Sequence, residues 1–109
     1  MAYNEALAER VRKALKGRRR LQEKRMFGGL AFLLRGNMCC GVVGDELMVR
    51  VGAEAYDEVI SARHVRPMVF TGKPLKGFVY VKPEGLAGDR ALKAWVTRAA
   101  EYALSQPEK

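Results

Sequence analysis

Between Leu30 and Val51, apolar residues form three short runs separated by two glycine-containing pairs. The pairs are Gly36-Asn37 and Gly44-Asp45, and residues of these types tolerate the positive φ angles that tight hairpin turns require. The pattern predicts a three-stranded antiparallel meander with strands at Leu30–Arg35, Met38–Val43 and Glu46–Val51.

Alternation of side chains along these strands assigns their residues to two faces. We expect Leu34 to pair with Cys39 and Val42 to pair with Leu47. One face, which we expect to be the core, carries Ala31, Leu33, Met38, Cys40, Val42, Leu47, Val49 and Val51. The second face is also mainly apolar, although an antiparallel sheet in a small monomer usually shows water a polar second face.

The apolar character of this second face predicts that another surface covers it. Its apolar residues make it a candidate interface with a second subunit, and the alternative is a cover from a helix or the 63–77 loop of the same chain. We favour self-association, as a homodimer. The candidate interface residues are Leu30, Phe32, Leu34, Cys39, Val43 and Met48.

Apolar residues at helical spacing predict helices on both sides of the meander. Residues 4–16 are expected to form an amphipathic helix that begins with Asn4 as its N-cap and ends at Gly17. A second helix is predicted at 53–62 and a third from Asp89 to about Leu104. Further strands are expected at 26–27, at 68–70 within a long 63–77 loop, and at 78–81. This order predicts an α+β fold with the helices packed on one face of an antiparallel sheet.

The composition favours a polyanionic partner. The 109 residues include 20 Lys and Arg against 12 Asp and Glu, for a net charge of +8. The densest positive charge follows the first helix, and a patch there could contact phosphates. The alternative is that these charged residues are simply hydrated where the chain leaves the first helix. No aromatic residues lie among them that could stack on bases. The candidate nucleic-acid-binding residues are Arg18, Arg19, Arg20, Lys24 and Arg25.

The sequence gives catalysis little support. His64 is the one histidine and has no nucleophile nearby in sequence. Cys39 and Cys40 are adjacent, and neighbouring strand residues point to opposite faces, so we expect neither a shared metal ion nor a disulfide. Gly72-Lys73 and Gly28-Gly29 lack the spacing of phosphate-binding loops. We expect no catalytic residues, no metal and no cofactor.

Nothing in the sequence indicates a membrane or a secretion route. No apolar run approaches the roughly 18 residues of a membrane span, and the first ten residues lack the apolar core of a signal peptide. We expect a cytoplasmic protein with a single domain over residues 1–109.

Several motifs together resemble the N-terminal domain of the TfoX/Sxy family, which comprises regulators of bacterial competence. The motifs are Met26-Phe27-Gly28-Gly29 followed by Phe32, then Gly44–Gly52, Arg66-Pro67-Met68, Gly77–Val81 and Trp95. The resemblance implies an α+β fold similar to that of type III secretion chaperones, with no enzymatic activity and no cofactor. Two-domain members carry a helical second domain. Because this sequence stops at Lys109, we expect a single-domain regulatory module.

Two functional hypotheses follow. The first is a non-enzymatic regulatory protein-interaction module that forms a homodimer and binds an unidentified regulatory protein. The alternative is a nucleic-acid-binding accessory protein that uses the basic segment 18–25.

Overall fold

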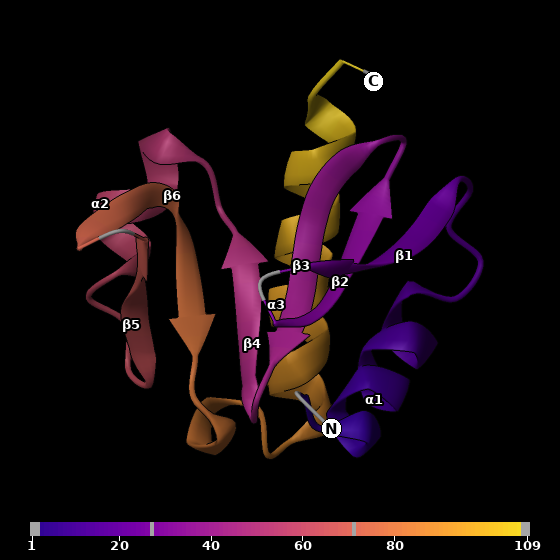
Figure 1. Ribbon diagram of the computed structural model, residues 1–109, viewed down its shortest axis with the longest axis horizontal. Coiled ribbons are helices and arrows are strands. Elements are labelled where there is room, and N and C mark those ends of the chain that lie inside the picture. The colour runs from indigo at the N-terminus through magenta and orange to yellow at the C-terminus, as the bar shows by residue number, and fades with distance from the viewer. Residues whose placement is uncertain (1–2, 27, 71, 108–109) are drawn as a thin grey trace.

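The computed structural model describes residues 3–26, 28–70 and 72–107, which form an α+β fold (Figure 1). This confirms the predicted fold class, including helices before, within and after the strands. The elements are α1 (Glu5–Leu15), β1 (Leu21–Met26), β2 (Gly29–Leu34), β3 (Asn37–Val43), β4 (Glu46–Arg50), α2 (Ala53–Val59), β5 (Val65–Phe70), β6 (Lys73–Val81), a 3₁₀ turn η1 (Pro83–Gly85) and α3 (Asp89–Ser105).

The strands form one open antiparallel sheet in the order β1-β2-β3-β4-β6-β5. The first four strands follow one another as hairpins, and this includes the predicted meander. The chain then passes through α2, runs along the outer edge as β5 and returns between β5 and β4 as β6. The strand expected at 68–70 is confirmed as the second half of β5. The rest of the predicted 63–77 loop is wrong, because most of it belongs to the β5–β6 hairpin. Pro67 is tolerated in β5 because that strand lies at the edge of the sheet.

The predicted register is right for the second hairpin and wrong for the first. Val42 pairs with Leu47 and Cys40 with Val49, as predicted. In the first hairpin Leu34 pairs with Asn37 rather than with Cys39. The turn consists of Arg35 and Gly36, with φ angles of 55° and 82°, so it lies one residue earlier than expected.

Because a one-residue shift in register moves every side chain of a strand to the opposite face, the side chains of β2 lie on the faces opposite to those predicted. Leu30, Phe32 and Leu34 face the helices and belong to the core, whereas Ala31 and Leu33 lie on the second face. A register shift opposite Phe32 and Leu33 marks a β-bulge in β3. The bulge lets the successive residues Cys39 and Cys40 both enter the core.

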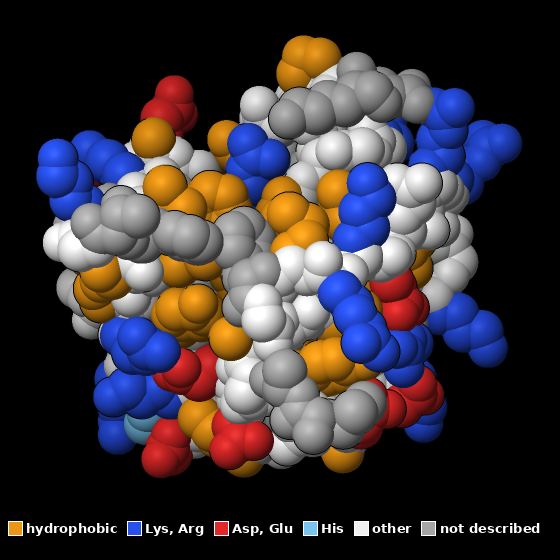
Figure 2. All heavy atoms as spheres, in the orientation of Figure 1, with side chains coloured by type: hydrophobic (Ala, Val, Ile, Leu, Met, Phe, Trp, Pro, Cys, Tyr) orange, Lys and Arg blue, Asp and Glu red, His pale blue; other side chains and the backbone are white. Residues whose placement is uncertain are grey.

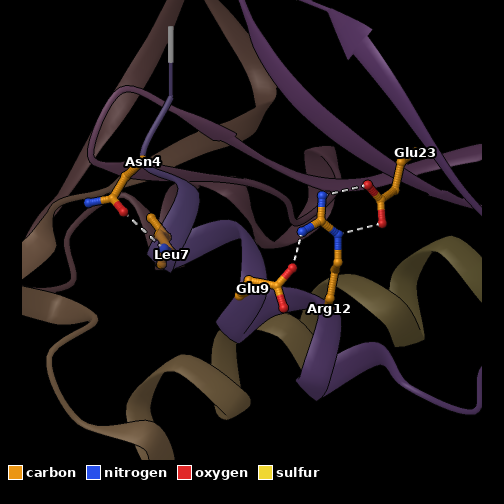
Figure 3. Close-up of polar contacts among 5 residues, drawn as sticks. All are labelled: Asn4, Leu7, Glu9, Arg12 and Glu23. Atoms are coloured by element: carbon orange, nitrogen blue, oxygen red, sulfur yellow. Dashed lines mark hydrogen bonds and ion pairs between the residues drawn. The ribbon is translucent and has the colours of Figure 1, made fainter. Parts of the chain in front are cut away.

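Helix α1 has the expected amphipathic pattern and the expected ends. Its apolar side chains Leu7, Val11 and Leu15 are buried in the core. The Asn4 side chain accepts a hydrogen bond from the Leu7 backbone N–H at 3.0 Å (Figure 3), which satisfies one of the unpaired donors of the first turn. Gly17, with a φ of 91°, follows the end of the helix.

Helix α3 is the main cover of the sheet. It crosses behind β3 and β4 in Figure 1 and also contacts β2 and α1. The side chains it buries are Leu92, Val96, Ala99, Ala100 and Ala103. Three of the five are alanines, which allows the helix axis to approach the strands closely. None of the helices in the described part of the chain is long and apolar enough to span a membrane.

Candidate nucleic-acid interface

The structure divides the predicted basic segment between two places. Arg18, Arg19 and Arg20 lie in the connection between α1 and β1, whereas Lys24 and Arg25 lie within β1. Lys24 pairs with Ala31 and Arg25 with Leu30, so these two side chains belong to opposite faces of the sheet. On the face turned away from α3, Lys and Arg side chains are scattered rather than gathered (Figure 2). The five residues therefore do not form a single patch.

The three arginines of the connection line a surface hollow of about 720 Å³. Its wall also includes Gly17 and two residues that are distant in sequence, Arg35 from the β2–β3 turn and Leu104 from the end of α3. Leu104 is 36% exposed. The hollow thus places four guanidinium-bearing residues around a partly exposed apolar side chain. Arg35 was not among the predicted binding residues, because the apolar pattern places it at the end of a strand.

The two loops that carry these arginines are joined through their backbones. The Arg35 N–H donates a hydrogen bond to the Arg20 carbonyl at 3.3 Å. Both residues have left-handed backbones, with φ angles of 59° at Arg20 and 55° at Arg35. Non-glycine residues rarely adopt this conformation, and asparagine and aspartate are the usual exceptions. Arginine is therefore an unfavourable residue for both positions.

In the described part of the chain, the carboxylates that form ion pairs do so with arginines outside this hollow. The Arg12 guanidinium lies between Glu9 and Glu23 (Figure 3), with its Nε 2.8 Å from Glu23 Oε2. These two carboxylates raise the pKa of Arg12. Arg10 pairs with Asp89 at 3.3 Å. Each of these pairs neutralises a cation on α1. In contrast, Arg18, Arg19 and Arg35 of the hollow form no ion pair with any of the described residues.

A second basic hollow adjoins the first. It lies between α1 and α3, has a volume of about 590 Å³, and begins at Lys16, next to Gly17 of the first hollow. Its other cationic residues are Arg10, Lys13 and Lys93, and Asp89 is its one acidic residue. Lys16 and Gly17 are consecutive, so the two hollows are joined at the end of α1, and we refer to them together as the basic track.

The predicted interface residues mostly belong to the core, which corrects their assignment. Leu30, Phe32, Leu34 and Cys39 are buried beneath the helices of the same chain. Of the other two, Met48 lies on the second face but is fully buried, and Val43 is half-buried. The cause is the shifted first hairpin together with the bulge.

The second face carries an ordered polar group that the sequence did not predict. Arg66 of β5 extends over the ring of Tyr80, 4.5 Å from its centroid, and its Nε lies 2.8 Å from Glu46 Oε2 of β4. Burial raises the pKa of Tyr80, and the hydrogen bond with Glu46 raises the pKa of Arg66. These residues link three strands, so they are best understood as support for the sheet.

The two cysteines are both free and fully buried, which contradicts the expectation that Cys39 lies on the second face. Their Sγ atoms lie 3.9 Å apart. The hydrogen bond with Cys39 and burial in the core raise the pKa of the Cys40 thiol well above its usual value. The protonated form is therefore favoured. Within the described residues, no three or more His, Cys, Asp or Glu side chains are placed to hold a metal ion together.

Comparison with known proteins gives one match. Residues 13–103 match the family model described as the TfoX N-terminal domain. No curated protein and no solved structure matches the chain.

Proposed function

Because the chain belongs to the TfoX N-terminal domain family, we propose that it is a non-enzymatic regulatory module, similar to the corresponding domain of competence regulators, and that it acts by binding a macromolecule. The non-enzymatic part of this proposal is supported by the described groups with the largest pKa shifts, because these groups are engaged with other side chains of the fold. Arg12 pairs with Glu23, and Cys40 contacts Cys39 in the core. Their perturbation has a structural cause in each case.

Nucleic acid is the partner that the surface favours. The observation that carries this proposal is the basic track along α1 and α3, which ends in the arginine-lined hollow. A chain with a net charge of +8 attracts polyanions. Lys and Arg side chains that contact phosphates release counterions, and this release supplies most of the affinity for nucleic acid.

A titration of the protein against labelled duplex and single-stranded oligonucleotides tests this proposal. We expect binding at low salt whose affinity falls linearly with salt on a logarithmic scale, with a slope that reports the number of phosphates neutralised. Absence of binding to either form at low salt would contradict nucleic-acid binding. Expression of the domain in its source cell, followed by pull-down with and without nuclease, identifies the biological partner.

Binding to a protein, including a second copy of the chain, is the alternative. Its basis is weaker than the sequence suggested, because four of the six residues that motivated a homodimer lie in the core. Two chains that each carry +8 also repel one another. Light scattering at low and moderate salt decides this point, and a monomer under both conditions would argue against the homodimer.

A further inference from the structure

We propose that the hollow at the end of α3 is a binding site for the phosphodiester backbone of nucleic acid, and that Arg35 contacts a phosphate there together with Arg18 and Arg19. This inference rests on the nucleic-acid binding proposed above, and it adds the site and a residue from outside the basic segment. The hollow is formed only when the α1–β1 connection, the β2–β3 turn and the end of α3 meet.

Three arginines of the hollow carry charge that no side chain of the described residues neutralises. Among residues 3–26, 28–70 and 72–107, Arg18, Arg19 and Arg35 make no side-chain hydrogen bond or ion pair. A guanidinium presents several N–H donors in a planar fork that fits two oxygens of one phosphate. Three such groups around one hollow repel one another, so an anion between them would be attracted by all three.

The backbone at Arg35 also points to a ligand contact. A two-residue turn with positive φ at both positions favours Asn-Gly, whereas this turn has Arg-Gly. An arginine there gives the fold nothing that asparagine would not provide better. Residues held in unfavourable backbone conformations concentrate at functional sites. A ligand contact made by the side chain explains why an arginine occupies this position.

The shape of the basic surface favours an extended polyanion. The two hollows of the basic track contact α3 near its beginning, at Lys93, and near its end, at Leu104, and these residues lie about 16 Å apart at the rise of an α-helix. A single inorganic phosphate would fill only one end of it. A nucleic-acid strand, with a charge about every 3.4 Å along the axis of a duplex, would engage several of its cations. A membrane surface would require a broad apolar anchor beside the charges, and Leu104 alone does not provide one.

The test uses Arg35→Asn, because this change removes the charge and improves the turn. We expect its midpoint of thermal unfolding to equal or exceed that of the wild type. We expect its affinity for a labelled oligonucleotide at low salt to fall about tenfold, the loss typical of one hydrogen bond to a charged group. The salt slope should fall by about one phosphate contact.

Arg63→Asn is the matched control. Arg63 is exposed, lies between α2 and β5 at the other edge of the sheet, and gives the same change in net charge. If Arg35→Asn and Arg63→Asn weaken binding equally, general charge is responsible and the proposed site is wrong. Arg19→Gln provides a second test within the hollow, and it should reproduce the loss seen with Arg35→Asn.

Equal weakening by Arg35→Asn and Arg63→Asn, when the wild type binds oligonucleotide, overturns this inference and leaves nucleic-acid binding standing. Two other outcomes overturn both. If the wild type binds no oligonucleotide at low salt, both are wrong. If it binds anionic phosphatidylserine vesicles through Arg35 but binds no oligonucleotide, the hollow is a lipid site and the inference is overturned. Loss of oligonucleotide binding in Arg35→Asn and Arg19→Gln, with normal binding in Arg63→Asn, would establish the site.

Discussion

Replacing Phe32 with aspartate tests the assignment of β2 to the core. Phe32 is fully buried in the core, opposite Cys40 in β3 and Glu23 in β1. The sequence pattern instead predicted that this side chain lies on an intermolecular face. The two arrangements give opposite outcomes, because an aspartate on such a face would dissociate a dimer and leave the monomer folded.

The expected loss of stability can be built from two contributions. Removing a buried phenylalanine ring costs about 3–5 kcal/mol, as measured for truncation to alanine. A carboxylate in the same place must lose its hydration or become protonated, which adds about 1–3 kcal/mol or more, and its neighbour in the sheet is another carboxylate, Glu23. Domains of this size have a free energy of unfolding of about 5–15 kcal/mol. Phe32→Asp should therefore remove most or all of the stability.

Circular dichroism and light scattering on the same sample provide the measurement. We expect Phe32→Asp to lose its cooperative thermal transition or to melt far below the wild type. Val69→Asp is the control, since Val69 is 52% exposed on the edge strand β5 and should lose no more than about 1 kcal/mol. A folded, monomeric Phe32→Asp protein with near-normal stability would refute the placement of Phe32 beneath the helices.

Three further predictions concern the packing of Gly52 against α3 and the two buried cysteines of β3. Gly52→Ala should destabilise the fold by about 1–3 kcal/mol, because Gly52 has a φ of 86° and an added Cβ would lie 2.3 Å from Cε1 of Tyr102; Gly88→Ala, with no atom within 4 Å of the added Cβ, should lose less in the same thermal melt. Cys39 and Cys40 should both resist thiol reagents in the native protein and react on unfolding, as read by mass spectrometry, and rapid native labelling of either would contradict their burial. Because the folded state raises the pKa of Cys40, its contribution to stability is present at neutral pH and lost as the pH rises past the ordinary thiol range.

Elements with strong local signals could be predicted from the sequence. Helix α1 begins at an asparagine that caps it and is followed by a glycine with positive φ, and both signals were recognised. The β3–β4 hairpin has a two-residue Gly-Asp turn, and its register was predicted correctly. In each case residues within a few positions of one another determine the structure.

Features that depend on distant contacts could not be predicted in the same way. Strands β5 and β6 contain Pro67, Pro74 and Gly77, which locally favour a loop. They become strands because β4 provides a partner for β6 and β6 then provides one for β5. The hollow depends on three segments that are more than ten residues apart, so no spacing in the sequence could reveal it.

The failure at the first hairpin is more informative, because local preference and structure disagree there. Gly36-Asn37 fits the local preferences for a turn, yet the chain turns at Arg35-Gly36. Asn37 is instead buried, and its side chain donates a hydrogen bond at 2.8 Å to the carbonyl of Pro107, beyond the end of α3. This bond and the burial of Phe32 fix the earlier turn, and they leave Arg35 in a left-handed conformation that its residue type disfavours. Natural sequences break local rules mainly at functional or strained positions, so Arg35, which breaks the local preference of this turn, is also the best residue at which to test function.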